Sequence, residues 1–358
     1  MNPTPTGDSD QRAAKPSTRR GLSRRTFAGG AAAASVLTAV GVSQAVASVS
    51  GRRPTARLGT AANAPGLPTG FAKTFKSRFV TANGVRQHVV IGGDGPPLLL
   101  VHGWPQTWYA WRFVMPELAK SYTVIAVDQR GIGLSDKPAG GYDNGNIAMD
   151  LASLMTSLGY AKFAVAGHDT GMVASYALAA DYPDRVARVA LMEVPGPPSR
   201  VASPPAFLPG PANNKLWHIP FNRIGKTAEQ LITGREDIFF GYEFKIQGGT
   251  LPADLVSYYI GLVSDPVSLS GSLGFYRDFD GTLDQNDERA KTPLPMPVLA
   301  VGGVEGWGTA VGEHLDGLAT SIQTVAVPGA GHWVAEQAPA TLVTEFKAFF
   351  APYRAAVG

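Results

Sequence analysis

The stretch Phe163-Ala-Val-Ala-Gly-His-Asp-Thr-Gly171 decides most of what this chain can be. Its first four residues are apolar and predict a short buried strand, and residues 172–181 predict a helix that begins directly after the turn. Glycines stand on both sides of Asp169, because so sharp a turn leaves no room for side chains there. The strained backbone therefore presents one carboxylate at the end of a buried strand.

A strand, a tight turn and a helix in this spacing form the nucleophile elbow, G-x-S-x-G, with Asp169 at the position of the serine. A carboxylate that attacks an acyl carbon gives a reactive anhydride. Attack on an sp3 carbon gives an ordinary alkyl ester, which water can hydrolyse afterwards. Asp169 thus argues against esterase or peptidase chemistry and for epoxides or carbon–halogen bonds. Taken alone, G-x-D-x-G also fits an ordinary strand–helix turn.

Three further segments follow predicted strands and favour a nucleophile elbow over an ordinary strand–helix turn. Val101-His-Gly-Trp-Pro105 and Asp128-Gln-Arg-Gly131 each end an apolar strand, and Gly331-His-Trp333 lies in a glycine-rich loop far downstream. The chain order is nucleophile first and histidine last, with the acid expected between them. This is the order of the α/β-hydrolases.

Together these motifs resemble the epoxide hydrolase branch of the α/β-hydrolases, from Phe79 to Phe350. Finer features are similar to the Cif-type secreted epoxide hydrolases, namely Leu191-Met-Glu-Val-Pro195, Leu216-Trp-His218 and Phe275-Tyr-Arg277. The resemblance implies hydrolysis of an epoxide to a vicinal diol through an Asp alkyl ester. The substrate would be a small apolar epoxide, water the second reactant, and no cofactor would be needed.

The order of predicted elements indicates an α/β-hydrolase fold, a mostly parallel sheet with helices on both faces. Strands are expected at 85–91, 97–101, 122–127, 163–166, 186–192, 298–301 and 324–327, and helices at 111–120, 146–158, 172–180 and 339–350. From Pro195 the alternation gives way to aromatic, helix-like segments. We therefore expect a core of residues 71–194 and 293–358 and an inserted helical cap over 195–292.

Composition limits the function classes. The chain has 358 residues, 44% of them hydrophobic, which suits one large domain with an insertion. It has no cysteine, which excludes disulfides, thiolate catalysis and cysteine metal sites. The net charge is +3, but residues 1–47 carry +4 and the remainder −1, so the basic balance does not indicate nucleic-acid binding. Whether the chain forms a homodimer stays open.

Residues 1–47 have the pattern of a Tat signal peptide. Ser23-Arg-Arg-Thr-Phe27 precedes a weakly apolar run, and Ala45-Val-Ala47 offers a cleavage site. The alternative is a disordered basic tail. The run is too short and too rich in glycine and alanine for a membrane span. We expect a periplasmic or extracellular protein whose residues 48–70, rich in Gly, Pro, Ala and Thr, form a flexible linker.

His332 is the candidate general base toward water, because imidazole titrates near working pH. The acid that would orient it has two candidates. Glu193 ends an apolar strand, where an unpaired carboxylate would be costly, and Glu305 follows the next strand. Cif-type enzymes and fluoroacetate dehalogenases use the earlier position, so the resemblance favours Glu193, with Glu305 as the alternative.

The remaining predicted site residues are hydrogen-bond donors. The backbone amides of Trp104 and Thr170 would form an oxyanion hole. The resemblance implies that two cap residues, His218 and Tyr276, donate to the epoxide oxygen, although both also fit plain aromatic packing.

The other candidates suggest structural roles. His102, His168 and Asp128 lie beside the predicted site but fit structural positions, and His88 and His314 fit ordinary surface histidines. No spacing of His, Asp or Glu indicates a metal site.

Two rival functions remain at this stage. A haloalkane or haloacid dehalogenase would use the same nucleophile and base. Haloalkane dehalogenases usually carry Trp after the nucleophile and fluoroacetate dehalogenases carry Arg nearby, where this chain has Thr170 and Val173. A non-catalytic binding protein of the same fold is the alternative from a different class.

Overall fold

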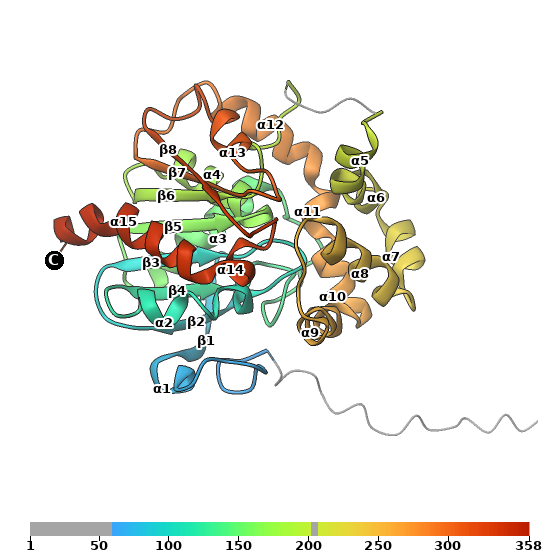
Figure 1. Cartoon of the computed structure of the whole chain (residues 1–358), viewed down its shortest axis with the longest axis horizontal. Helices are drawn as coiled ribbons and strands as arrows, with labels where there is room; N and C mark the ends of the chain where they lie inside the picture. Colours follow the sequence, from blue (N-terminus) through green and yellow to red (C-terminus); the bar gives the residue numbers. More distant parts are fainter. Residues whose placement is uncertain (1–58, 202–206, 358) are drawn as a thin grey trace, which may run out of the picture. The chain divides into compact units, whose positions relative to one another are not determined.

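The computed structural model describes residues 59–201 and 207–357 (Figure 1). The predicted signal peptide and residues 48–58 lie outside this part of the chain. The described residues build one eight-stranded sheet of order β1-β2-β4-β3-β5-β6-β7-β8. The strands are β1 (Lys76–Ala82), β2 (Val85–Gly92), β3 (Pro97–Val101), β4 (Thr123–Val127), β5 (Phe163–His168), β6 (Val186–Met192), β7 (Val298–Gly303) and β8 (Ile322–Val327).

All strands from β3 onward pair in parallel, and β1 and β2 add an antiparallel edge. The central strands β3 and β5 are buried along their whole length, as continuous apolar runs between two helical layers should be. Because the strands are parallel, β3, β5, β6, β7 and β8 all end at one edge of the sheet. The loops at that edge carry the candidate site.

Helices cover both faces of the sheet. On one face α3 (Asn144–Ser157) and α4 (Thr170–Asp181) pack together, and on the other α15 (Pro339–Val357) packs with α2 (Met115–Leu118) (Figure 1). No helix of the described residues is both long and apolar enough to cross a membrane.

The cap lies between β6 and β7, as the predicted insertion requires. Its helices are α5 (Gly210–Leu216), α6 (His218–Asn222), α7 (Lys226–Ile232), α8 (Glu236–Ile246), α9 (Ala253–Val263), α10 (Pro266–Ser272), α11 (Gly274–Arg277) and α12 (Phe279–Arg289). In Figure 1 they form the yellow and orange group beside the sheet. The predicted α/β-hydrolase fold, with helices on both faces and a helical cap, is confirmed.

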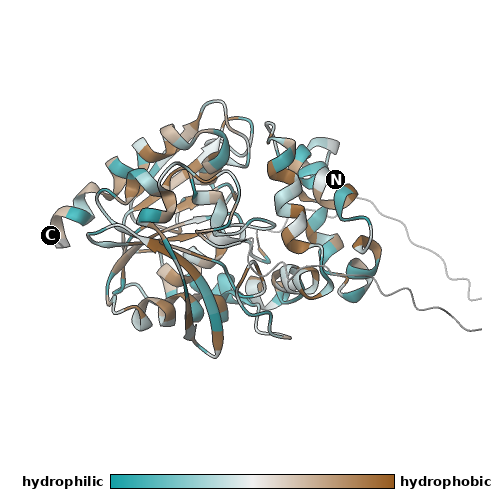
Figure 2. Cartoon of the chain, turned by 90° about the horizontal axis from the view of Figure 1, so that it is seen from below, coloured by the Kyte–Doolittle hydropathy of each residue, from teal (hydrophilic) through white to brown (hydrophobic). Residues whose placement is uncertain are grey.

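Two local predictions were wrong. The helix expected over 111–120 is a 3-10 turn, Trp108–Trp111, followed by the short α2, because Pro116 has no N–H to continue an earlier helix. Strand β1 was missed. Most of its residues are exposed or half-exposed, so it lacks the apolar alternation that marks a strand. The sheet edge turned toward the viewer in Figure 2 accordingly shows long hydrophilic stretches.

The segment 59–70 is not a free linker, contrary to the prediction. Ala61 is buried and its N–H donates to Ser77 Oγ at 3.0 Å. The Trp108 indole donates to the Gly59 carbonyl at 2.7 Å. These contacts tie the segment to the core next to β1, although its composition is that of a loop.

Candidate active site

Asp169 stands at the turn between β5 and α4, with φ 52° and ψ −122°. Such a positive φ is strained for any residue but glycine, so the surrounding structure must hold it. The flanking glycines allow the close packing that does so. A Cβ on Gly167 would lie 2.2 Å from the Gly171 carbonyl oxygen, and one on Gly171 would lie 2.3 Å from the His102 carbonyl oxygen. The turn predicted from the sequence is present.

The carboxylate of Asp169 is held by backbone donors. The Trp104 N–H donates to Oδ1 at 2.8 Å, which leaves Oδ2 for other partners. Burial alone would raise the pKa of Asp169. The hydrogen bond and charge of His332, together with His168 and the Thr170 N–H, outweigh burial and lower the pKa to about 2. Asp169 is thus an anion throughout the neutral range.

His332 joins two carboxylates. Its Nε2 lies 3.6 Å from Asp169 Oδ2, and its Nδ1 lies 3.2 Å from Glu193 Oε2. Burial alone would lower the pKa of His332, but the hydrogen bonds to both acids raise it to about 9. In the resting protein the ring is therefore an imidazolium at pH 7.

Glu193 directly follows β6 and is fully buried with φ 61°. Its Oε1 accepts a hydrogen bond from the Gly303 N–H at the end of β7, while Oε2 faces His332. Glu305 is exposed on the loop beyond β7. The structure thus brings Glu193 to the histidine and leaves the alternative acid in solvent.

His218 and Tyr276 contact each other and Trp104, whose N–H donates to Asp169. The His218 ring stacks on Trp104 at 5.3 Å, and Tyr276 stands edge-on to both rings, 5.3 Å from Trp104 and 5.7 Å from His218. Burial, then the charge of Asp169, raises the pKa of Tyr276 well above 10. Burial lowers the pKa of His218 to about 4. Near neutrality both side chains are uncharged.

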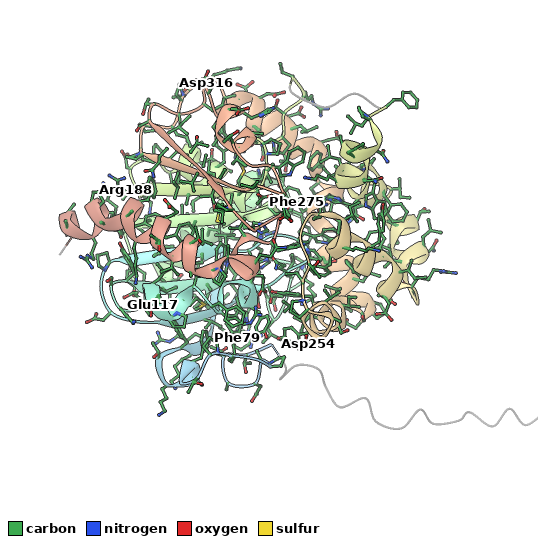
Figure 3. The ribbon with its side chains drawn as sticks, viewed as in Figure 1. Phe79, Glu117, Arg188, Asp254, Phe275 and Asp316 are labelled. Atoms are coloured by element: carbon green, nitrogen blue, oxygen red, sulfur yellow. The ribbon has the colours of Figure 1, made fainter. Side chains whose placement is uncertain are left out.

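A largely apolar hollow near the nucleophile turn is lined in part by Trp104 and Thr170. Phe275, labelled in Figure 3 where the cap meets the core, contributes one wall. The other lining residues are Gln129, Arg130, Ile132, Tyr142, Ile147, Gly271 and Ser272. Arg130 is paired with Asp150, so its charge is already matched. In the described part of the chain no cluster of three His or acidic residues could hold a metal.

The other histidines near the sheet have structural partners. His102 Nδ1 bonds the Gly103 carbonyl, and the His168 Nε2 bonds the His332 carbonyl at 2.7 Å. Asp128 accepts from the Trp108 N–H at 2.8 Å, as a turn-forming residue would.

His88 corrects a prediction. It was expected at the surface, but its ring is fully buried between Asp128 and Ser77, 2.8 Å from each. His314 is exposed, as expected.

Two buried acids escaped the sequence reasoning. Glu243 on α8 lies 3.2 Å from His218 Nδ1. Glu336 binds Arg112 at 2.6 Å and accepts from the Tyr259 hydroxyl of the cap at 2.7 Å. For Glu243 the available signal was weak, a single acid among the buried aromatic residues of α8. Glu336 lies in the short helix α14 (Val334–Gln337), where no pattern marks it.

Comparison with known proteins agrees with this geometry. A model of the alpha/beta hydrolase fold family matches residues 96–339. The chain belongs to the α/β-hydrolase family. It is 32% identical over 278 residues to the soluble epoxide hydrolase of Corynebacterium sp. (strain C12), covering 76% of this chain and 96% of that protein. This relationship places the hydrolase in the epoxide hydrolase branch.

Two other proteins are similar to this chain. The crystal structure of Cfl2 from Burkholderia cenocepacia superimposes with a TM-score of 0.72 at 34% identity, covering 77% of this chain and 96% of that one. A fluoroacetate dehalogenase of Burkholderia sp. is 32% identical over 240 residues, 63% of this chain and 77% of that protein.

Proposed function

We propose that this hydrolase converts small apolar epoxides to vicinal diols through a covalent ester on Asp169. One observation carries the proposal. Asp169 has one oxygen held by the Trp104 amide, and its other oxygen lies 3.6 Å from His332 Nε2. Two uncharged donors, His218 and Tyr276, pack together against Trp104. This combination suits attack on a carbon whose leaving oxygen must take up a proton.

In the first step, Asp169 Oδ2 attacks one epoxide carbon and forms the ester bond. The ring carbon–oxygen bond breaks, and its electron pair stays on the oxygen. His218 or Tyr276 supplies the proton that this oxygen needs. Both donors are neutral near pH 7, because burial lowers the pKa of His218 to about 4 and raises the pKa of Tyr276 well above 10.

Ester formation removes the negative charge of Asp169, so His332 releases its resting proton to solvent. In the second step the neutral ring removes a proton from water, whose oxygen adds to the ester carbonyl. The oxyanion develops on Oδ1, where the Trp104 N–H already donates and the Thr170 N–H adds a second donor. Collapse breaks the acyl–oxygen bond, and the imidazolium gives its proton to the departing diol. The proton left on the Asp169 carboxyl group returns to the donor that lost its own in the first step, and His332 takes back its resting proton from solvent, which regenerates the resting site. Glu193 orients the ring and balances its charge.

Dehalogenation is the second candidate, because a fluoroacetate dehalogenase is among the relatives. The same Asp169 and His332 would serve. Thr170 and Val173 occupy the positions where fluoroacetate dehalogenases carry arginine, and the groups that act most on the Asp169 carboxylate are His332 and His168. An anionic haloacid would therefore lack its expected clamp, which favours the epoxide.

The decisive experiment traps the ester. His332→Gln should still let Asp169 open an epoxide and then stall, so the intact mass should rise by that of one substrate. Digestion should place the adduct on the peptide with Asp169. Asp169→Ala, the matched control, should show no adduct. In the wild type, one turnover in heavy-oxygen water should label the Asp169 carboxylate.

The other outcomes are informative too. An adduct formed from a halogenated alkane while every epoxide of a panel fails would assign the protein to the dehalogenases. No adduct from either class would mean that Asp169 is not a nucleophile, and a non-catalytic binding role would then be the better account.

We further propose that the enzyme is exported by the Tat route and works in the periplasm or outside the cell. The support is the twin-arginine pair ahead of a modest apolar run and an Ala-x-Ala site.

A further inference from the structure

The cap holds a buried acid for which the proposed mechanism has no role. Glu243 on α8 is only 2% exposed. Its Oε1 accepts from the Gln247 side chain at 2.5 Å and lies 3.2 Å from His218 Nδ1, but not in line for a hydrogen bond. His218 Nδ1 and Glu243 Oε2 are both buried without a hydrogen-bond partner, so a proton shared by the two side chains would satisfy both groups after a small rotation. Burial of a carboxylate is costly unless a positive or donating partner compensates it. A proton shared by Glu243 and His218 would provide this compensation, and it can lie on either side chain.

The position of this proton decides whether His218 can donate at all. A neutral imidazole carries one N–H, and the hydrogen bond at one ring nitrogen fixes which nitrogen has it. If Glu243 is ionised, Nδ1 keeps the hydrogen and donates it to the carboxylate. Nε2, the nitrogen left for the substrate, is then bare and cannot protonate an epoxide oxygen.

One additional proton reverses this. A protonated Glu243 donates its O–H to Nδ1, and the ring hydrogen moves to Nε2. The alternative form, an imidazolium beside a carboxylate, also carries a hydrogen on Nε2. His218 is thus a donor only while the pair with Glu243 holds two protons in total.

We propose, on the basis of the proposed epoxide chemistry, that Glu243 is a positioning residue. In its protonated form it occupies Nδ1 of His218 and keeps the Nε2 hydrogen aimed at the epoxide oxygen. Release of one proton from the pair switches this donor off.

The electrostatics of the site support the two-proton state near neutrality. Burial, against the hydrogen bond from Gln247, raises the pKa of Glu243 to about 7. Burial lowers the pKa of His218 to about 4, against the charge of Asp169 and the Lys215 carbonyl. The carboxyl group therefore keeps its proton to higher pH than the imidazolium does.

The groups around the pair either shift the pKa of Glu243 in opposite directions or keep the same charge over the pH range of interest. Among core residues, His332 lowers the pKa of Glu243 and Asp169 raises it, and the neighbouring Trp217 lowers it. Tyr276 on α11 and Tyr259, which stacks on Phe244 of α8, have pKa values raised well above 10 by burial. Neither tyrosine changes charge between pH 5 and 9, so a pH effect in this range belongs to the pair.

The test isolates ring opening. In His332→Gln the rate of adduct growth reports the first step alone, and we expect it to be flat at low pH and to fall as pH rises through the pKa of the pair. His332→Gln removes the positive charge that lowers the pKa of Glu243, so the rate of adduct growth should begin to fall at or above pH 7. Asp237→Asn, an exposed carboxylate-to-amide change on the same helix, is the matched control and should leave the profile unchanged.

Glu243→Gln should slow ring opening by about 10- to 100-fold, below the full range of general acid catalysis because Tyr276 still donates. The amide oxygen would accept from Gln247 and from Nδ1, which leaves Nε2 bare at every pH. The falling limb should therefore vanish. His218→Phe should lose a similar factor, and Glu243→Gln should add nothing to it, since both changes remove the same donor.

A residue that only supports the fold would give losses that add in the double variant, and this outcome would overturn the proposal. Nitrogen NMR of His218 in the otherwise unchanged protein gives an answer even where a variant fails to fold. It should show the Nε2–H form at pH 6, and an Nδ1–H form throughout would also overturn it. No adduct in His332→Gln itself would instead contradict the proposed function, while the NMR result would still decide the tautomer.

Discussion

Replacement of Asp169 by asparagine should lower the pKa of His332. In the resting enzyme the hydrogen bonds to Asp169 and Glu193 outweigh burial and raise this pKa to about 9. His332 is then protonated at pH 7 and cannot take a proton from water. The ester formed in the proposed first step carries no charge at Asp169, and asparagine imitates that neutral state.

The magnitude follows from the separation of the two groups. His332 Nε2 and Asp169 Oδ2 are 3.6 Å apart. With an effective dielectric constant of about 20, a pair of unit charges at this distance attracts by about 4 to 5 kcal/mol. Since one pKa unit corresponds to about 1.4 kcal/mol, the pKa of His332 should fall by about 3, to roughly 6. Neutral imidazole would then dominate at pH 7.

Histidine-selective labelling and an NMR pH titration would measure the change. The chain has six histidines, so comparison with His332→Gln assigns the resonance. Asp237→Asn, exposed on the cap, controls for a general change in charge. An unchanged His332 pKa in Asp169→Asn would refute the reasoning. It would mean that Glu193 alone holds the proton and that ester formation does not activate the base.

Three other outcomes are expected. Glu193→Gln should slow ester hydrolysis by orders of magnitude, as loss of the orienting acid does in other triads, whereas Glu305→Gln should be mild; steady-state rates would show the ranking, and the reverse would move the role to Glu305. Changing Arg24 and Arg25 to Lys should leave precursor in the cytoplasm, and fractionation that still finds mature protein outside the inner membrane would contradict Tat export. Ser77→Ala removes the hydrogen bond from the Ala61 N–H and the one with the His88 ring, and should lower the free energy of unfolding by about 1 to 2 kcal/mol, measured by thermal denaturation; an unchanged melting temperature would mean that these bonds contribute little.

The elements that the sequence predicted well are those with a strong local cause. β3 is a continuous apolar run, β5 begins with four apolar residues, and both strands are buried throughout. The turn at Asp169 needs glycines at fixed positions, so the sequence motif alone predicts the geometry of the turn. Local signals of this kind survive folding because tertiary contacts reinforce them.

The errors arise where contacts between distant parts of the chain determine whether a residue is buried. His88 looks like a surface residue on a polar strand, yet Asp128, 40 positions away, pairs with it in the interior. The segment 59–70 has the composition of a linker and is held by contacts with Ser77 and Trp108. Such pairings join distant parts of the chain and leave no periodic trace in the sequence.

The orienting acid shows the same limit within the site. Both Glu193 and Glu305 follow parallel strands, so strand order alone permits either. The structure separates them by backbone direction. Glu193 has a positive φ that turns its side chain inward onto the Gly303 N–H, whereas Glu305 stays in solvent. A sequence motif does not carry that difference.

The site as a whole illustrates how one chemical group serves opposite purposes. Asp169 is half-buried and Glu243 is buried, and burial raises the pKa of each carboxyl group. Asp169 also has His332 and backbone N–H donors, which lower its pKa to about 2 and make it a permanent anion. The main hydrogen-bond donor to Glu243 is the neutral Gln247, so burial prevails and raises the pKa of Glu243 to about 7, where the carboxyl group can hold a proton. Separation of the two pKa values by environment is how paired carboxyl groups divide nucleophilic and acid roles. In the proposed mechanism the cap supplies the proton that the core nucleophile cannot, so a reaction that needs both groups would require the cap to be in place.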